Sequence, residues 1–215
     1  TVTTPAPVVA VLLAAGRATR FGGEKLLAPL AGRPLAGHIA DTLRRALEMD
    51  ILQGVLAVVR ERGTPLGALL EATGLSQVEA PDAERGIAHS LRAGFAALEQ
   101  SLPPGRAAAL VVLADQPDTD PVVIASLVAR WRVTGAGAVR PRYSGEPDVP
   151  GHPVLIDRSM WPLVQQLEGD EGLGAVLRSG QVAVELVPVD GRNPDIDTRA
   201  DLAARDTPEE EQACD

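Results

Sequence analysis

The sequence predicts an α/β fold of three layers, in which a mostly parallel sheet lies between two layers of helices. Apolar runs of strand length, such as residues 8–14 and 107–114, are continuous rather than alternating, as strands buried on both faces require. Between these runs lie segments whose apolar residues recur every three or four positions, as on the buried face of a helix. Strands that alternate with helices are typical of parallel sheets, whose ligands bind beyond the carboxyl ends of the strands.

In the first half of the chain the predicted elements follow one another regularly. Strands are predicted over residues 8–14, 54–59, around Val78 and over 107–114, and helices over 34–49, 65–73, 89–102 and 120–132. The first helix has an apolar face formed by Leu35, Ile39, Leu43 and Leu47. Gly74 is expected to close the second helix, and Asp120 followed by Pro121 is typical of a helix start.

The second half of the chain is less regular. Short strands are predicted over residues 136–140, 154–156 and 182–187, a helix over 159–167, and another short helix after the segment GDEG. Asp197 or Thr198 is expected to cap the last helix. One domain is predicted over residues 1–205, and the acidic segment 206–215 is predicted to be a disordered tail.

Composition excludes several classes of function. With 215 residues, 45% of them apolar, the chain is long enough for one well-filled core. A net charge of −9 and an aromatic content of 2% argue against nucleic acid or an acidic membrane surface as partners. No apolar run reaches the length of a bilayer span and no signal peptide is recognisable, so a cytoplasmic location is expected. The single cysteine excludes a disulfide framework.

The segment LLAAGRATRFGGEKLL, residues 12–27, combines small residues with the cations Arg17, Arg20 and Lys25. Its glycines let backbone N–H groups approach phosphate oxygens closely, and the cations neutralise charge that the amides cannot. On an acidic protein this local positive charge favours a small polyanion. By itself the segment is also compatible with an ordinary turn, because it contains neither the dinucleotide fingerprint nor the Walker pattern.

Carboxylates follow two of the predicted strands. Asp115 closes the strand 107–114, where it is either a turn former before Pro117 or a ligand of Mg²⁺, which prefers one or two carboxylates together with substrate phosphates. Asp195 and Asp197 precede the last helix. One of these two is expected to act as a helix cap, and the other is a candidate second ligand of the same metal.

Two further segments are candidates for contacts with a substrate. GIAHSLRAG, residues 86–94, opens a helix with small residues and Ser90, which suits a base edge or a phosphate as well as a plain helix start. His152 lies beside a strand in a Pro/Gly-rich segment, where substrate contact and simple turn structure are equally compatible with the sequence.

Taken together, these segments resemble the nucleotidyltransferases that complete molybdenum cofactor, and most closely their cytidylyltransferase branch. The matching segments are LLAAGRATRFGGEKLL, GRPL, GIAHSLRAG, LADQP, GHPVL, GDEG and DIDT, which occur in this order between about Val8 and Leu202. The resemblance implies a Rossmann-like nucleotidyltransferase domain that uses Mg²⁺ and a nucleoside triphosphate. It also implies that the loop after the first strand holds the triphosphate.

By this resemblance each motif receives a role. The implied catalytic residues are Lys25, Arg20 and Asp115; the implied nucleotide-binding residues are Leu13, Ala14, Ala15, Gly16, Arg17, Lys25, Gly86, Ser90 and Asp115; His152, Asp170 and Glu171 are implied to bind the acceptor; and Asp115 and Asp197 are implied to bind the metal. Ala14 and Ala15 stand where the guanylyltransferase branch usually carries a glycine, which favours CTP over GTP because their methyl groups are expected to crowd a purine.

The expected reaction joins CMP from CTP to a molybdopterin-type cofactor and releases pyrophosphate, with a molybdenum hydroxylase as the possible client of the product. The alternatives are a guanylyltransferase, a nucleotidyltransferase of the same fold acting on a sugar or alcohol phosphate, and a non-catalytic carrier of the mature cofactor. Phe21 in place of the more usual methionine is interpreted as a packing change, and the longer segment 144–150 leaves the acceptor side open.

Overall fold

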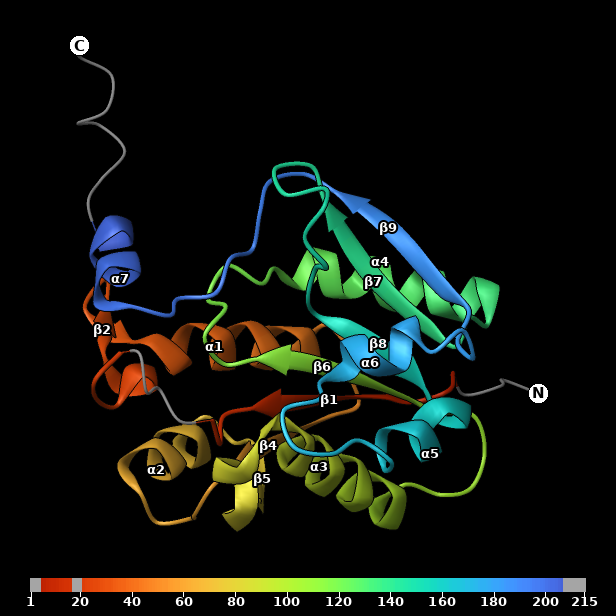
Figure 1. Ribbon diagram of the computed structural model, residues 1–215, viewed down its shortest axis with the longest axis horizontal. Helices are drawn as coiled ribbons and strands as arrows, with labels where there is room; N and C mark the ends of the chain where they lie inside the picture. Colours follow the sequence, from red (N-terminus) through yellow and green to blue (C-terminus); the bar gives the residue numbers. More distant parts are fainter. Residues whose placement is uncertain (1–4, 17–20, 207–215) are drawn as a thin grey trace.

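The computed structural model describes residues 5–16 and 21–206. In this part of the chain the main strands are β1 (Val8–Leu13), β4 (Gly54–Val59), β5 (Ser76–Glu79), β6 (Ala108–Leu113), β7 (Ala138–Tyr143), β8 (Val154–Asp157) and β9 (Val184–Val189). They form one seven-stranded sheet in the order β5-β4-β1-β6-β8-β7-β9 (Figure 1). The predicted α/β fold with a mostly parallel sheet is confirmed.

The direction of the strands divides the sheet into two parts. Strands β5, β4, β1 and β6 pair in parallel, and β7 pairs in parallel with β9. Strand β8 lies between the two groups and is antiparallel to both of its neighbours. The carboxyl ends of β1 and β6 therefore reach the same edge of the sheet, the edge near α7 (Arg199–Asp206) in Figure 1.

Helices cover both faces of the sheet. One face is covered by α1 (Leu35–Glu48), α2 (Pro65–Ala72) and α4 (Pro121–Thr134), and the other by α3 (Ile87–Ser101), α5 (Trp161–Val164) and α6 (Leu173–Arg178). Alternate residues of β1 face these two layers: Leu12 belongs to the apolar cluster under α1 and α4, and Val11 to the one under α3. Both faces of the strand are buried, which explains its unbroken apolar run.

Short elements form the rest of the edge at which β1 and β6 end. The 3-10 turn η1 (Lys25–Leu27) is followed by a two-stranded hairpin of β2 (Pro29–Leu30) and β3 (Arg33–Pro34), and α7 lies beside β2 (Figure 1). A third apolar cluster, made of Phe21, Leu30, Leu35 and Ile196, joins these elements. Phe21 is thus a packing residue, as the sequence suggested, and it ties the end of the first loop to the segment before α7.

Several elements differ from the predicted ones. The helix predicted over 159–167 is a 3-10 turn, η3 (Arg158–Met160), followed by the four residues of α5, because Pro162 has no N–H to join the two into one helix. The strand predicted over 182–187 is shifted by two residues, since Val182 packs in the apolar cluster and pairing with β7 begins at Val184. The hairpin of β2 and β3 and the turn η2 (Pro81–Arg85) were not anticipated.

The predicted tail, residues 206–215, lies outside the described residues except for Asp206, the last residue of α7. The domain boundary at residue 205 therefore stays a prediction. Among the described residues, no helix is long and apolar enough to cross a membrane.

Candidate active site

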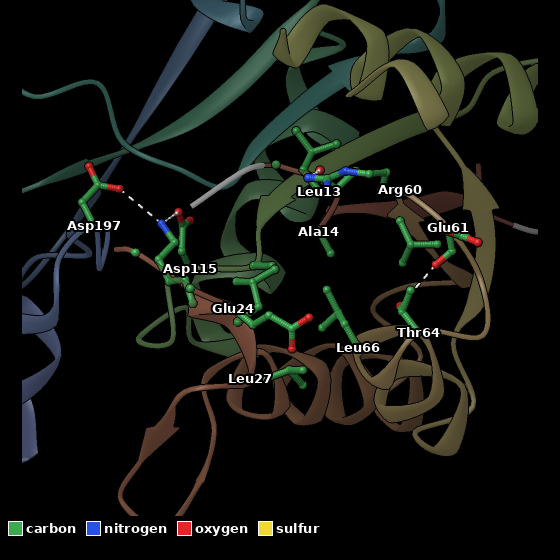
Figure 2. Close-up of a pocket in the computed structure, with 18 residues that line it drawn as sticks. Leu13, Ala14, Glu24, Leu27, Arg60, Glu61, Thr64, Leu66, Asp115 and Asp197 are labelled. Atoms are coloured by element: carbon green, nitrogen blue, oxygen red, sulfur yellow. Dashed lines mark hydrogen bonds and ion pairs between the residues drawn. The ribbon is translucent and has the colours of Figure 1, made fainter. Parts of the chain in front are cut away.

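The edge where β1 and β6 end carries the larger of two cavities. Leu13 of β1 pairs with Leu113 of β6, so the loop after β1 and the segment at Asp115 leave the sheet side by side. The cavity has a volume of about 680 Å³. Figure 2 shows its lining, which comes from residues 13–16, 22–27, 59–61 and 114–115 and from Thr64, Leu66 and Asp197.

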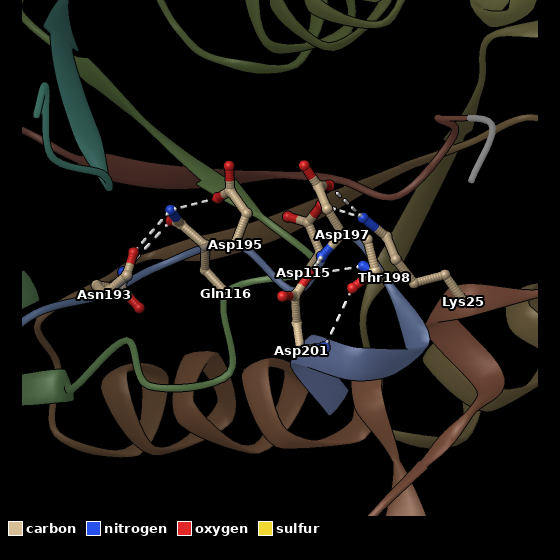
Figure 3. Close-up of polar contacts among 8 residues, drawn as sticks. All are labelled: Lys25, Asp115, Gln116, Asn193, Asp195, Asp197, Thr198 and Asp201. Atoms are coloured by element: carbon tan, nitrogen blue, oxygen red, sulfur yellow. Dashed lines mark hydrogen bonds and ion pairs between the residues drawn. The ribbon is translucent and has the colours of Figure 1, made fainter. Parts of the chain in front are cut away.

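Within this cavity the Lys25 ammonium lies between two carboxylates (Figure 3). Its Nζ donates to Asp115 Oδ2 at 2.7 Å and to Asp197 Oδ1 at 3.2 Å. The Lys25 side chain is 10% exposed, whereas those of Asp115 and Asp197 are 24% and 45% exposed. Three residues that are far apart in the sequence therefore form one charged cluster that is open to the cavity on its carboxylate side.

The lysine of this cluster stays charged. Burial alone would lower the pKa of Lys25, but the hydrogen bond and the charge of Asp115, followed by those of Asp197, outweigh it and raise the pKa above its ordinary value. The cluster thus combines one fixed positive charge with two carboxylates.

Asp197 reaches the cluster because the residues before and after it, Ile196 and Thr198, are held in place by packing and hydrogen bonds. Ile196 is fully buried in the third apolar cluster, and its N–H donates to the carbonyl of Asp115 at 3.0 Å. The helix start itself is satisfied by Thr198 and Asp201, whose side chains accept hydrogen bonds from each other's backbone N–H at 3.1 and 2.7 Å. Thr198, the second of the two predicted caps, is thus the capping residue, and the Asp197 carboxylate faces Lys25 instead.

Asp195 takes a different direction (Figure 3). Its Oδ1 accepts from Gln116 Nε2 at 2.7 Å, and the same nitrogen donates to the carbonyl of Asn193 at 3.0 Å. Burial and the nearby charge of Asp115 raise the pKa of Asp195. Asp195 therefore fastens the segment 193–197 to the loop after β6, and Asp197 is the carboxylate that joins Asp115 on the lysine.

A second cavity of about 320 Å³ lies on the other side of the loop after β1. It shares Leu13, Gly16 and Asp115 with the first and is otherwise lined by Ala83, Glu84, Gly86, Ile87, Ser90, Leu113 and Asp170. It therefore brings together two of the segments that the sequence singled out, GIAHSLRAG and GDEG. Ser90 is almost fully buried there.

Glycine is required where these two segments meet. Gly86 has a φ of +132°, and a Cβ at this position would lie 2.0 Å from the carbonyl oxygen of Gly169. That carbonyl accepts from the N–H of Ala88 at 3.1 Å. The close approach places Asp170 against the start of α3, at the mouth of the second cavity.

Not every residue named from the sequence lies at these cavities. Leu13, Ala14, Ala15, Gly16, Lys25, Asp115 and Asp197 line the first, and Gly86, Ser90 and Asp170 line the second. Arg17 and Arg20 lie outside the described residues. Glu171 lines neither cavity, and its carboxylate accepts from the N–H of Glu168 at 2.9 Å, which stabilises the turn.

His152 also lines neither cavity. Its carbonyl accepts from Tyr143 Oη at 3.0 Å and from Asn193 Nδ2 at 3.3 Å. Burial, with a smaller contribution from the charge of Arg140, lowers the pKa of the imidazole to about 4, so the ring is neutral at pH 7. In this structure His152 joins the β7–β8 connection to the segment that carries Asp197.

Sequence reasoning missed Arg60 at the first cavity. Its Nη2 donates to the carbonyl of Ala15 at 3.4 Å, and its Nε is buried without a hydrogen-bond partner among the described residues. Figure 2 shows its side chain close to Leu13 and Ala14. The sequence could have indicated Arg60, because it is a cation directly after β4. Strands β4 and β6 lie on either side of β1 in the sheet.

The donor set at the lysine cluster fits a Mg²⁺ ion. Mg²⁺ is usually held by one or two carboxylates and completes its coordination with water and substrate phosphates. Asp115 and Asp197 supply the two carboxylates and already share one cation, Lys25. Among the described residues, no group of three or more His, Cys, Asp or Glu side chains could hold a metal ion, so phosphates and water would supply the remaining ligands.

Comparisons with known proteins identify the family of the chain. Residues 10–185 match the family model of the MobA-like NTP transferase domain. Purine catabolism protein PucB of Bacillus subtilis is 31% identical to this chain over 206 residues, which are 89% of this chain and 92% of PucB. The crystal structure of Rv0371c from Mycobacterium tuberculosis superposes with a TM-score of 0.75 at 25% identity, covering 94% of this chain and 99% of Rv0371c.

Rv0371c has also been solved as a complex with manganese, and that structure superposes with a TM-score of 0.71 at 25% identity over 93% of this chain and 97% of Rv0371c. A relative of this fold has therefore been seen with a divalent metal. The family model spans most of the chain, the Bacillus relative aligns over nearly its whole length, and the fold is that of α/β nucleotidyltransferases. The chain belongs to the MobA-like NTP transferase family of nucleotidyltransferases.

Proposed function

We propose that this protein transfers CMP from CTP to a molybdopterin-type cofactor and releases pyrophosphate. The observation that carries the proposal is the cluster of Lys25, Asp115 and Asp197 at the end of two parallel strands, beside a loop rich in glycine. A nucleotidyltransferase needs a cation and metal-binding carboxylates at the point where a triphosphate is cleaved. The family membership and the motifs that resemble the cytidylyltransferase branch supply the rest of the argument.

Charge neutralisation and positioning account for the chemistry. The phosphate of the acceptor is already anionic, so it attacks the α-phosphorus of CTP without a general base, in line with the departing pyrophosphate. Lys25 and Arg20 neutralise the charge that develops on pyrophosphate, while Asp115 and Asp197 hold Mg²⁺. When bound there, Mg²⁺ polarises the phosphoryl group and stabilises the leaving oxygen.

The two cavities suit the two ends of a nucleotide. The residues 13–16 and Lys25 would contact the phosphates in the larger cavity, and Gly86 and Ser90 would contact the base in the smaller one, since the two cavities share Leu13, Gly16 and Asp115. Of the three residues expected to bind the acceptor, Asp170 is the one that lines either of these two cavities, and there it borders the proposed position of the base. His152 and Glu171 would act on the acceptor only through the segments that they stabilise.

The preference for CTP over GTP is the most specific part of the proposal. Ala14 and Ala15 are 4% and 2% exposed, and they belong to apolar clusters on opposite faces of the sheet. These alanines line the larger cavity, and the flanking residues Leu13 and Gly16 also border the smaller one, so the alanines would act on the base through the course of the loop. A site that pairs its polar groups with cytosine rejects a base that leaves them unpaired, at about 1–3 kcal/mol for each group.

The product, a cytosine dinucleotide form of the cofactor, would be delivered to a molybdenum hydroxylase. The name of the Bacillus relative, a purine catabolism protein, is compatible with a client that hydroxylates a heteroaromatic substrate.

The test is a competition between CTP and GTP at equal concentration, with molybdopterin cofactor as the acceptor and pyrophosphate release as the readout. We expect CTP to exceed GTP by about ten- to a thousandfold in kcat/KM, and Ala15→Gly to narrow this ratio. A preference for GTP would identify a guanylyltransferase. Release that requires a sugar or alcohol phosphate would identify a different acceptor, and cofactor binding without any release would identify a carrier.

A further inference from the structure

The position of Lys25 has a consequence for metal binding. Its ammonium makes the two contacts, to Asp115 at 2.7 Å and to Asp197 at 3.2 Å, that a metal ion shared by these carboxylates would make. A divalent cation and an ammonium cannot occupy the same point between two carboxylates. The ammonium of Lys25 therefore occupies the point at which the shared metal would be held.

We propose that Lys25 holds the metal position closed in the nucleotide-free enzyme and releases it when a triphosphate arrives, so that the metal and the nucleotide bind as a coupled pair. The inference rests on the proposed function in one respect, that the ligand carries a triphosphate. It assigns Lys25 a second role, in addition to its contact with the leaving pyrophosphate.

The charges in the cluster favour this exchange. Counted over Lys25, Asp115 and Asp197 alone, the two carboxylates and one ammonium have a net charge of about −1. A divalent ion is attracted less by this charge than by two free carboxylates, and it would also repel the lysine at close range. A triphosphate brings several negative charges and attracts the ammonium away from the carboxylates. The two carboxylates then face the metal with a charge of about −2, and Lys25 retains an anionic partner in the triphosphate.

The local structure allows the exchange without a change in the backbone. The main chain of Lys25 is fixed in η1, because its N–H donates to the carbonyl of Gly23 at 3.0 Å and its carbonyl accepts from the N–H of Ala28 at 3.1 Å. The flexible side chain borders the cavity of about 680 Å³ together with Gly16, Gly22 and Gly23. Rotation about the side-chain bonds is sufficient to carry the ammonium from the carboxylates to a phosphate.

The experiment measures the affinity of the nucleotide-free protein for Mn²⁺ by calorimetry or by electron paramagnetic resonance of free Mn²⁺. We expect Lys25→Met to bind Mn²⁺ at least about tenfold more tightly than the wild type, because the competing charge is gone while a side chain of similar length remains. Lys25→Arg should bind Mn²⁺ as weakly as the wild type. The matched control is Arg44→Met, which removes a cation paired with Glu48 on the exposed face of α1 and should leave the affinity unchanged.

A second measurement uses the wild type alone. Its affinity for Mn²⁺ should rise at least about tenfold in the presence of a non-hydrolysable CTP analogue, after correction for the metal bound to the free analogue, and this rise should be smaller in Lys25→Met. The double variant Lys25→Met/Asp115→Asn should lose the gained affinity. If Lys25→Met does not fold, Lys25→Gln provides the same comparison.

Equal Mn²⁺ affinity in the wild type and in folded Lys25→Met would overturn the inference, because the metal would then bind without displacing the lysine. A gain of the same size in Arg44→Met would also overturn it, since the effect would come from net charge alone. The nucleotide-free measurement contains no acceptor and no CTP. Its outcome is therefore independent of which nucleotide and which acceptor are used in turnover, and a failure of the proposed reaction is seen separately in the pyrophosphate assay.

Discussion

The two halves of the sheet position their functional side chains by different means. In the half made of β5, β4, β1 and β6, parallel strands end at one edge, and Asp115 and the loop after β1 lie there because their strands pair residue by residue. In the half made of β8, β7 and β9, one strand is reversed. The segment that returns from β9 to the site is held there by side-chain hydrogen bonds, chiefly those of Gln116 and Asn193.

The two halves of the sheet therefore contribute differently to the site. The parallel half provides Lys25 and Asp115, whose charges face the cavity. The mixed half provides one charged group, Asp197, together with a buried polar network that holds it in place. Changes in the first half should therefore reduce turnover with little effect on stability, and changes in the second should first be seen in stability.

The largest effect is expected from Asp115→Asn. The substitution keeps size and hydrogen bonding but removes a charge that holds Mg²⁺ against the phosphates, so kcat should fall by about a hundred- to a thousandfold while the melting temperature changes little. Asp118→Asn is the matched control, because its carboxylate pairs with Arg205 at the surface and should leave turnover intact. Near-normal turnover of folded Asp115→Asn would remove the residue from the metal site.

The second prediction concerns acid stability and His152. The pKa of His152 is lowered from an ordinary 6.5 to about 4 in the native state. Between these pH values the unfolded chain therefore binds a proton that the native state does not bind. Stability should therefore fall as the pH decreases from 6.5 to about 4, by up to about 3 kcal/mol from this residue. Urea unfolding across this range checks the slope, and His152→Phe should flatten it. A slope that is identical in the variant would mean that the imidazole is not the group responsible.

The third prediction concerns the buried network that supports Asp197. Asn193 Nδ2 donates to Gln116 Oε1 at 3.3 Å, to Thr119 Oγ1 at 3.1 Å and to the carbonyl of His152 at 3.3 Å. Asn193→Ala removes the donor to all three acceptors, although the carbonyl of His152 keeps its hydrogen bond from Tyr143 Oη. The variant should be destabilised by about 2 kcal/mol.

The comparison for Asn193→Ala is Gln100→Ala, an exposed change on α3 that should alter stability by less than about 0.5 kcal/mol. Denaturant unfolding of both variants measures the difference. Equal stability of the two variants would show that the network does not hold the segment in place.

The smallest effect is expected from Asp195→Asn. Burial and the charge of Asp115 raise the pKa of Asp195, so the ionised carboxylate disfavours the native state above that pKa. The amide of the variant still accepts a hydrogen bond from Gln116, and it removes the repulsion between the carboxylates of residues 195 and 115. Residue 195 is partly surrounded by protein atoms but still has an exposed surface, so water screens the repulsion. The variant should therefore be more stable by less than about 1 kcal/mol.

The size of this effect depends on pH. The gain in Asp195→Asn should be present near pH 7 and should vanish below the ordinary pKa of 3.8, where the carboxyl is neutral in both the native and the unfolded state. Thermal unfolding at the two pH values tests this. A loss of stability at pH 7 would show that the charge of Asp195 contributes favourably to the cluster.

Local patterns were sufficient for most of the parallel half. The continuous apolar runs predicted β1, β4 and β6 within one residue of their bounds, because burial on both faces leaves no position for a polar side chain. Position at a strand end was also sufficient to single out Asp115. By contrast, the helix predicted over 159–167 and the strand over 182–187 were displaced, because a proline and the pairing with β7 decided where those elements begin.

The sequence by itself determined the α/β fold, the strand-end position of Asp115, and the group of charged candidates that includes Lys25. Each of these depends on neighbours along the chain. The family resemblance named Asp197 as the second carboxylate, and the structure shows it at Lys25 while Asp195 accepts a hydrogen bond from Gln116. The tertiary structure alone decided that Arg60 borders the larger cavity and that His152 supports a turn and lines neither cavity. These outcomes depend on contacts between residues that are distant in sequence, whose side-chain directions are fixed only when β6, β8 and the segment before α7 pack together.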